Sequence, residues 1–397
     1  MFKYLNRHTN VPSIIKRKKS CLILGPRGTG KSVYIEKLTC KQKNLFSINL
    51  LKTDIFTRYL ADPSLLRKEV EQILKKTETL IVIIDEVQKV PSILNEVHFL
   101  IEAYKNRCTF ILTGSSARKL KQQNINLLAG RAILVPFFSF NYKEVDFKNN
   151  LNNILQFGLL PEVFLDDNVE SKIDFLKTYT GVYLKEEIMQ ESLVRNIGNF
   201  NQFLELAAQL NGSQINYRNI SKKIGVSDNT VKSHYEILED TLIVSKIPAW
   251  TNSVKKQLQK AAKYYFFDNG VINSLTGELK TELKPSSFRY GLLFENLVVN
   301  EIIKINSLLG HDYKIFHYKS NHELEIDIIL QKNLQSNPIA IEIKSSTSPT
   351  AQEVKNILSI RQDYPKARCI VICNTPNNYI ENEIEFLSFP SGIKDIF

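Results

Sequence analysis

Several features that mark other protein classes are missing from this 397-residue sequence. No apolar run approaches the roughly 20 residues that a membrane-spanning helix needs, and residues 1–10 lack the apolar core of a secretion signal. Cysteines are few, odd in number and scattered, and no two form a Cys-x-x-Cys pair, which argues against a disulfide framework or a zinc knuckle. They are Cys21, Cys40, Cys108, Cys369 and Cys373. We expect a cytoplasmic protein without membrane contact, with reduced cysteines that serve as packing residues.

The composition is that of an ordinary globular protein, because hydrophobic residues make up 43% and charged residues 23%. A disordered or fibrous chain is therefore not expected. At roughly 100 to 200 residues per domain, the length indicates two or three domains. The 52 basic and 41 acidic side chains give a net charge of +11, which favours a polyanionic partner such as nucleic acid, although many basic proteins bind none.

The pattern of apolar residues changes twice along the chain. Residues 1–150 alternate apolar strands with helical stretches, which is typical of an α/β domain built on a parallel sheet. Residues 151–285 show helical spacing, and residues 286–397 return to a mixed α/β pattern after a long helix. The strands that we expect are 21–24, 80–84, 109–112 and 132–135 in the first domain, and 314–318, 324–330, 339–343 and 369–372 in the third. The expected helices include 33–38, 62–76, 93–105 and 292–308.

A phosphate-binding loop is predicted between the first strand and the helix that follows it. The segment Gly25-Pro26-Arg27-Gly28-Thr29-Gly30-Lys31-Ser32 fits the pattern G-x-x-x-x-G-K-[ST] in the required order of strand, loop and helix. Backbone N–H groups would surround the phosphates of ATP, Lys31 would reach the β- and γ-phosphates, and Ser32 would place its hydroxyl on Mg²⁺. The alternative is a glycine-rich turn that binds no ligand.

Polar residues follow two further strands of this domain. Asp85 and Glu86 end an apolar strand, where a nucleotide-binding sheet holds its metal-coordinating acid and its water-activating base. We expect Asp85 in the first role and Glu86 in the second; the alternative is an acidic strand end that caps the next helix. Ser116 ends the segment 112–116, whose hydroxyls could sense the γ-phosphate or belong to an ordinary turn.

The middle domain contains a helix, a glycine turn and a second helix over residues 219–235, which is the plan of a helix-turn-helix. In a DNA reader Asp228, Asn229 and Thr230 would face base edges, and Lys232 would face a phosphate. Residues 238–247 would form the wing hairpin. The alternative is a packing or protein-contact module. A basic stretch that would follow a phosphate backbone, or form a solvated helix face, contains Lys255, Lys256, Lys260 and Lys263.

Four ionisable residues are candidates for a site in the third domain. Asp327 lies within an apolar strand, and Glu342 and Lys344 end the next strand on the same face, while Glu295 lies on the long helix. Glu295, Asp327 and Glu342 would hold Mg²⁺, and Lys344 would orient water or stabilise a phosphate in a cleavage reaction. The alternative is a structural salt bridge of Lys344 with Asp327 or Glu342.

The chain resembles the AAA-family ATPases of archaea and bacteria that carry a C-terminal domain of unknown function. The residues that carry this resemblance are 25–32, 84–88, 112–116, 127–131, 158–161 and 265–270. By this resemblance Arg131 is a candidate arginine finger, acting across a subunit interface of a homo-oligomer, or else a sheet-end salt bridge. The third domain is similar to restriction-endonuclease-like nucleases, and the middle domain to winged helices.

Two functions follow as hypotheses. The first is an ATP-hydrolysing protein that binds DNA through its middle domain and cuts it, or once did, through its third. The second is an ATP-controlled switch or scaffold that binds another protein and has no nuclease chemistry. The resemblance does not separate them.

Overall fold

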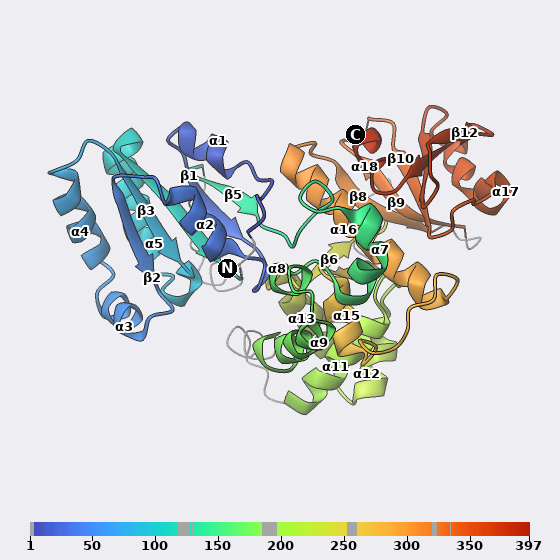
Figure 1. Ribbon diagram of the computed structural model, residues 1–397, viewed down its shortest axis with the longest axis horizontal. Helices are drawn as coiled ribbons and strands as arrows, with labels where there is room; N and C mark the ends of the chain where they lie inside the picture. The colour runs from blue at the N-terminus through green and yellow to red at the C-terminus, as the bar shows by residue number, and fades with distance from the viewer. Residues whose placement is uncertain are drawn as a thin grey trace. The chain divides into compact units, whose positions relative to one another are not determined.

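The computed structural model describes residues 4–116, 128, 130–184, 197–251, 260–319, 324–333 and 335–397. The chain divides into two compact units, drawn in Figure 1. The first unit comprises Met1–Ser139 with Asp240–Leu242, and the second comprises Phe140–Glu239 with Ile243–Phe397. The middle and C-terminal domains expected from the sequence thus lie together in one compact unit, and the boundary between them stays a prediction.

A parallel five-stranded sheet forms the centre of the first unit. Its order is β2-β3-β4-β1-β5. The strands are β1 Ser20–Leu24, β2 Leu45–Asn49, β3 Leu80–Asp85, β4 Cys108–Gly114 and β5 Ala132–Pro136. Strands β1, β3 and β4 are buried on both faces, which explains their nearly continuous apolar sequence. The α/β prediction for this region is therefore confirmed.

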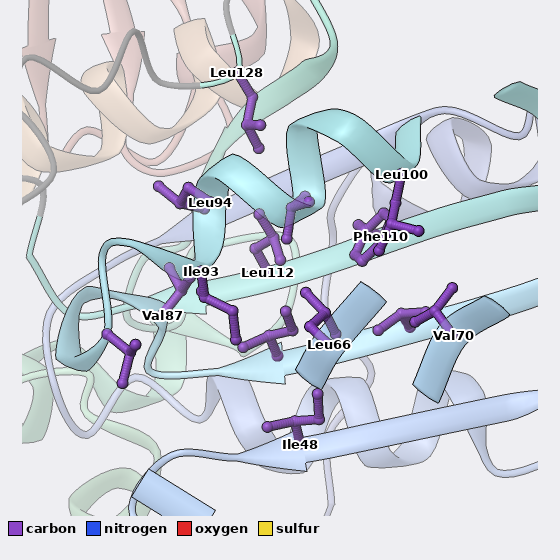
Figure 2. Packing of buried hydrophobic residues seen from close by; sticks show 14 of the residues in the cluster. Ile48, Leu66, Val70, Val87, Ile93, Leu94, Leu100, Phe110, Leu112 and Leu128 are labelled. Atoms are coloured by element: carbon purple, nitrogen blue, oxygen red, sulfur yellow. The ribbon is translucent and has the colours of Figure 1, made fainter. Parts of the chain in front are cut away.

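Alternate residues of the strands support two separate cores. Leu22, Leu24 and Phe110 face the core that α3 Thr53–Ala61, α4 Leu65–Leu74 and α5 Ile93–Tyr104 cover, part of which Figure 2 shows. Cys21 and Ile23 face the other core, against α1 Val11–Lys16 and α2 Lys31–Thr39. This period of two is the geometry of a strand, and it fixes which side chains meet which helix.

Helices make up the first part of the second unit. Those described are α7 Phe147–Phe157, α8 Pro161–Phe164, α9 Val169–Thr178, α11 Ile197–Gln209, α12 Tyr217–Ile224, α13 Asp228–Asp240, α15 Asn269–Leu275 and α16 Phe288–Leu309, with a π-helical turn at Tyr179–Tyr183. Two short strands, β6 Val244–Ile247 and β7 Lys263–Phe266, pair antiparallel. The expected hairpin at 238–247 was wrong in its bounds, because α13 continues to Asp240 and the partner strand begins only at Lys263.

A mixed six-stranded sheet forms the C-terminal part of the second unit, in the order β12-β13-β11-β10-β9-β8. The strands are β8 Lys314–Lys319, β9 Glu325–Gln331, β10 Ile339–Lys344, β11 Arg368–Cys373, β12 Tyr379–Glu381 and β13 Ile384–Ser388. β9 and β10 run antiparallel, with Ile341 opposite Ile328, whereas β10, β11 and β13 run parallel. Short helices α17 Ala351–Val354 and α18 Ile393–Ile396, and a 3₁₀ helix at Lys355–Gln362, complete this part.

Two segments that carry the resemblance, 158–161 and 265–270, meet around one buried carboxylate. Asp268 caps the start of α15 and accepts hydrogen bonds from the backbone N–H groups of Gly270 (2.9 Å) and Leu159 (2.7 Å). A Cβ atom on Gly158 would lie 1.9 Å from Asp268 Oδ1, and one on Gly270 would lie 2.1 Å from the carbonyl oxygen of Phe157. Both glycines are therefore required for packing, and this motif is structural in origin.

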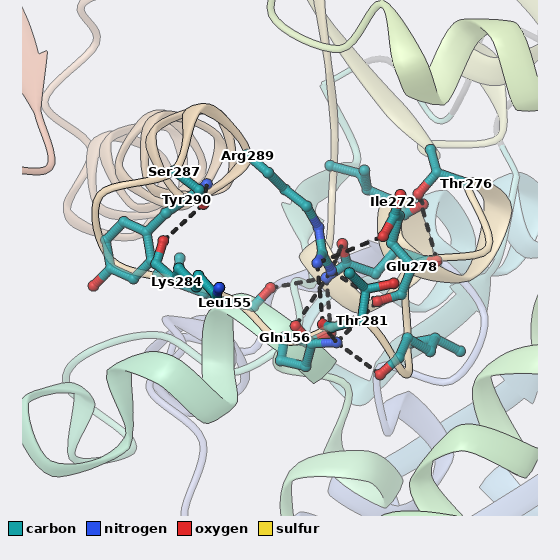
Figure 3. A network of polar contacts seen from close by, with 12 residues as sticks. Leu155, Gln156, Ile272, Thr276, Glu278, Thr281, Lys284, Ser287, Arg289 and Tyr290 are labelled. Atoms are coloured by element: carbon teal, nitrogen blue, oxygen red, sulfur yellow. Dashed lines mark hydrogen bonds and ion pairs between the residues drawn. The ribbon is translucent and has the colours of Figure 1, made fainter.

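A second polar network fixes the chain between α15 and α16 (Figure 3). The Arg289 guanidinium donates to the side-chain oxygens of Asn273 (2.9 Å) and Gln156 (3.2 Å) and to the carbonyl oxygen of Glu278 (2.8 Å). The Gln156 amide donates in turn to the carbonyl oxygens of Glu278 and Leu279. These bonds satisfy backbone groups of an irregular connection, as buried backbone requires.

All five cysteines are free thiols. Four of them are buried, and burial raises the pKa of Cys21 and Cys108 to about 12. Cys40 is exposed at the end of α2, so the expectation that every cysteine is a packing residue was wrong at this position. Among the described residues, no helix is both long and apolar enough to cross a membrane.

Candidate functional site

The predicted phosphate loop joins the end of β1 to the start of α2. Gly28 and Gly30 have φ angles of 81° and 87°, a region that favours glycine. Gly25 is required for another reason, because a Cβ atom there would lie 1.9 Å from the carbonyl oxygen of Phe137, beyond β5. Thr29 Oγ1 donates to the carbonyl oxygen of Pro26 at 2.8 Å, which closes the loop on itself. Arg27 is exposed at the loop surface.

Lys31 lies over this loop with only 5% of its surface exposed. Its ammonium group donates to the carbonyl oxygens of Gly25 (2.6 Å) and Pro26 (3.0 Å). A buried ammonium group is stable only when hydrogen-bond acceptors surround it, and here the loop backbone supplies them. The charge of Lys31 is therefore held at the loop where phosphates would bind.

Arg7, near the N-terminus, supports the same loop, and no motif in the sequence predicts this role. Arg7 donates to the carbonyl oxygens of Thr29 (2.7 Å) and Phe138 (2.6 Å), and its guanidinium lies 4.3 Å from the centre of the Phe137 ring. These charge-assisted bonds connect the phosphate loop to the segment that follows β5.

Ser32 and Asp85 meet as the metal-site prediction requires. Ser32, the second residue of α2, donates its hydroxyl to Asp85 Oδ2 at 3.0 Å, and Asp85 ends β3. Thr113 of β4 donates to the other Asp85 oxygen. A hydroxyl and a carboxylate brought together beside a phosphate loop are the ligand types that Mg²⁺ prefers. The two residues fit this ion, although their role stays a prediction.

Glu86 follows directly, in the left-handed region with φ 61°. Its backbone N–H donates to Thr113 Oγ1 at 3.0 Å. Its carboxylate accepts hydrogen bonds from the Gln88 amide and, at 3.3 Å, from the Ser115 hydroxyl. A non-glycine residue held at positive φ by neighbouring contacts is often found at a functional site. Ser116 is fully buried just beyond β4.

Arg131 begins the approach to β5 and forms an ion pair with Glu102 of α5. This contact matches the salt-bridge alternative, and the arginine-finger role stays a prediction that needs a second subunit. Leu127 and Ala129 of the same motif lie outside the described residues.

The C-terminal candidates lie close together but are each paired with protein groups. Asp327 Oδ2 accepts from the backbone N–H of Ile343 at 2.8 Å. Lys344 Nζ lies 2.8 Å from Glu342 Oε1, which is the salt-bridge alternative. Glu295 accepts from the Tyr265 hydroxyl at 2.7 Å. In the part of the chain that the structure describes, no group of three or more His, Cys, Asp or Glu side chains is arranged to hold a metal.

The protonation of these carboxyl groups is shifted by their surroundings. Burial raises the pKa of Glu295 and of Glu342 to about 7, and the charge of Asp327 adds to both shifts. Burial also raises the pKa of Asp327. The positive charges of Lys263 and Lys344 lower these pKa values, but by less than burial and Asp327 raise them.

Lys263 does not belong to a phosphate-tracking surface, so that prediction was wrong. Its side chain is 4% exposed, and its ammonium group lies 2.7 Å from Glu325 Oε1 and 3.9 Å from Glu295 Oε1. It is the first residue of β7, whose four residues are all buried. Lys260 is exposed, while Lys255 and Lys256 lie outside the described residues.

The two helices predicted in the middle domain are α12 and α13. Asn216 caps the start of α12, and Gly225 ends it with φ 68°. Asp228 accepts a hydrogen bond from Ser221 of α12, and Thr230 bonds to Ser227, so both help to hold the turn. Exposed residues near the start of α13 include Asn229 and Lys232, the latter 4.0 Å from Glu236.

Comparisons with known proteins divide the chain into three matched regions. Residues 17–146 match the family model of an AAA domain. Residues 148–282 match a domain of unknown function, DUF8612, and residues 290–391 match a second domain of unknown function, DUF4143. The order of the matches follows the order of regions in the sequence.

Curated relatives span most of the chain at low identity. An uncharacterized protein of Mycobacterium tuberculosis is 21% identical over 361 residues, covering 90% of this chain and 77% of the relative. An uncharacterized protein of Haemophilus influenzae is 22% identical over 390 residues, covering 92% of this chain and 90% of the relative. An uncharacterized protein of Methanocaldococcus jannaschii is 22% identical over 369 residues, covering 87% of this chain and 79% of the relative.

Among solved structures, PCH-2 of C. elegans covers 37% of this chain and 42% of its own, with a TM-score of 0.24 and 17% identity. A structure of Pif1 helicases on forked DNA covers 44% of this chain and 52% of its own, with a TM-score of 0.26 and 15% identity. The match to an AAA domain and the geometry of the phosphate loop together support ATP binding by the first unit.

Proposed function

We propose that this protein binds ATP with Mg²⁺ and hydrolyses it. The observation that carries the proposal is the meeting of Ser32 and Asp85, at 3.0 Å, beside Lys31 and next to Glu86. Loop N–H groups and Lys31 would bind the phosphates, Ser32 and Asp85 would hold Mg²⁺, and Glu86 would accept a proton from the attacking water. Mg²⁺ would supply charge neutralisation at the phosphates.

Two substitutions separate binding from hydrolysis. Lys31→Ala should abolish nucleotide binding, because the cation at the phosphates is lost. Glu86→Gln should bind ATP normally and lose about 10²- to 10⁴-fold in kcat, because only the base is removed. The exposed residues Lys41 and Glu36 provide matched controls, Lys41→Ala and Glu36→Gln. Normal hydrolysis by Glu86→Gln would show that the base is assigned wrongly.

We infer that the second unit associates with duplex DNA through α12 and α13. The support is a helix pair joined by a glycine turn, with exposed basic residues at the end of α12 (Lys222 and Lys223) and on α13 (Lys232). A net charge of +11 favours the same partner. A role as a protein-binding switch would use the same exposed surface.

For the C-terminal sheet, two chemistries compete. A Mg²⁺-dependent, nuclease-like site would use Asp327, Glu342 and Lys344, and it is favoured by the crowding of like charges. A structural ion-pair cluster belongs to the second function, an ATP-controlled protein-binding switch without nuclease activity, and the 2.8 Å pair of Lys344 with Glu342 favours it. Nicking of plasmid DNA by the full chain with Mg²⁺ and ATP separates the two functions.

The response of stability to metal separates the same chemistries independently of any substrate. A metal site should raise the melting temperature of the full chain in Mg²⁺ or Mn²⁺, and Asp327→Asn should remove that part of the rise. If the cluster is only an ion-pair network, Mg²⁺ or Mn²⁺ should change the melting temperature of wild type and of Asp327→Asn equally. Lys344→Ala should then destabilise the second unit, because it leaves Glu342 unpaired. ATP is omitted, so that the phosphate loop does not contribute through bound nucleotide.

A further inference from the structure

Gln88, Glu86 and Ser115 form a triangle of hydrogen bonds near the ends of β3 and β4. Gln88 belongs to a 3₁₀ turn, Val87–Lys89, and is 5% exposed. Its amide nitrogen donates both to the Glu86 carboxylate and, at 2.9 Å, to Ser115 Oγ. The Ser115 hydroxyl donates to the same oxygen of Glu86 at 3.3 Å. One carboxylate oxygen of Glu86 is therefore fixed by two donors from two elements.

The orientation of the Gln88 amide follows from its partners. An ionised carboxylate only accepts hydrogen bonds, so the NH₂ group and not the carbonyl oxygen must face Glu86. The amide oxygen then points away, and it is buried with no hydrogen-bond partner among the described residues. A Cβ atom on Gly114 would lie 2.8 Å from this oxygen, so the glycine at the end of β4 leaves the room that the amide occupies.

An unpaired buried carbonyl oxygen lowers the stability of the folded state. Such a group is unexpected in a residue whose purpose is packing, because an unbranched apolar side chain would fill the same space without that cost. What the glutamine adds is its pair of bonds to Glu86 and Ser115. A buried polar group without a hydrogen-bond partner is often kept because the residue has a functional role.

We propose that Gln88 is a positioning residue for ATP hydrolysis, whose amide holds the Glu86 carboxylate in place through Glu86 Oε2. This inference rests on the proposed function. In that reaction the attacking water gives a proton to Glu86 and forms a bond to the γ-phosphorus, while the bond from that phosphorus to the ADP oxygen breaks and its electrons leave with ADP. Gln88 takes no proton in this step. Its effect is to fix the carboxylate relative to the phosphates.

The test replaces Gln88 by methionine, which is unbranched and of similar length but has no hydrogen-bond donor to a carboxylate. Gln88→Met should lower kcat for ATP about 10- to 100-fold, because a small displacement of a catalytic group has an effect of that size. KM and nucleotide affinity should stay within about threefold, because the phosphate loop and Ser32 are untouched. The melting temperature should be unchanged or higher, because the unpaired oxygen is gone. Gln72→Met, at an exposed position of α4, is the control.

Dependence on Glu86 distinguishes positioning from a general structural role. In a Glu86→Gln background, Gln88→Met should cause no further loss of hydrolysis rate in a single-turnover measurement, because the carboxylate that Gln88 positions is already removed. A further loss there, a full rate in Gln88→Met, or a loss of rate that follows a lowered melting temperature or weakened nucleotide binding would each overturn the inference.

The same measurements separate this inference from the proposed function. A wild-type chain that hydrolyses ATP in a Glu86-dependent way, together with a fully active Gln88→Met variant, overturns only the role of Gln88. A wild-type chain without hydrolysis, or one whose hydrolysis survives Glu86→Gln, overturns the proposed function and this inference with it.

Discussion

Replacing Asp268 by asparagine should change how the stability of the second unit depends on pH. Asp268 is 3% exposed, and its carboxylate accepts hydrogen bonds from the backbone N–H groups of Leu159 and Gly270. Burial raises its pKa from 3.8 to about 6, against the opposing effect of these bonds and of Lys304. The folded state therefore binds a proton at this carboxyl more tightly than the unfolded state does.

The sign and size of the effect follow from those two pKa values. A raised pKa contributes stability that is fully present below the unfolded value of 3.8 and is lost as the pH rises through about 6. Between pH 7 and pH 5 the contribution grows by about 1.3 kcal/mol. Asparagine does not titrate, so the difference in the free energy of unfolding between wild type and Asp268→Asn should grow by that amount on acidification. Hydrogen bonds lost by the amide add a constant offset.

The assay uses the single tryptophan of the chain, Trp250, which is buried in the second unit. Its fluorescence during urea unfolding at pH 5, 6 and 7 reports on that unit, and ΔG is compared at each pH. Asp174→Asn, at an exposed position of α9, is the control and should follow the wild type at every pH. Equal pH dependence in wild type and Asp268→Asn, or a gap that narrows on acidification, would refute the reasoning.

Two further predictions concern the other charged contacts. Arg7→Ala should weaken ATP binding about 3- to 10-fold and lower the melting temperature, because it removes the hydrogen bond to Thr29 that supports the phosphate loop. Titration with a fluorescent ATP analogue measures the affinity, and Arg17→Ala, at an exposed position, is the control. Joint replacement of Lys222 and Lys223 by alanine should weaken duplex DNA binding and reduce the slope of log affinity against log salt by up to about 2, measured by fluorescence anisotropy between about 50 and 200 mM salt. Wild-type affinity that does not fall with salt would contradict DNA binding through phosphate contacts.

The sequence was most informative where the required geometry is local. The phosphate loop is a contiguous segment, and its glycines and Lys31 act within eight residues of each other, so a short pattern is enough to predict their arrangement. Asp85 and Glu86 could be named as candidates because a parallel sheet brings the ends of its apolar strands to one edge. Strand β2 was missed because it alternates polar with apolar residues and is half exposed, unlike its neighbours.

Roles that depend on distant partners were not accessible in this way. Gln88 lies in the segment 84–88 that carries the resemblance, yet its hydrogen bond to Ser115 depends on the register between β3 and β4. Lys263 resembled the other lysines of its stretch, because its ion-pair partner Glu325 is distant in the sequence. The strand that starts at Lys263 was itself unpredicted, and all four of its residues are buried.

The C-terminal cluster can be understood from its balance of charge. It contains four carboxylates and three ammonium groups that act on one another's pKa values. The carboxylates are Glu295, Glu325, Asp327 and Glu342, and the ammonium groups are Lys263, Lys344 and Lys319. The three lysines balance three carboxylates, so one negative charge remains when every group is ionised.

One proton would neutralise that remainder, whereas a divalent cation would exceed it by one charge. Burial and the charge of Asp327 raise the pKa of Glu295 and of Glu342 to about 7, which favours uptake of a proton by this cluster near neutral pH. Protons and a metal would then compete for the same oxygens, so any metal bound here must be held more weakly in acid.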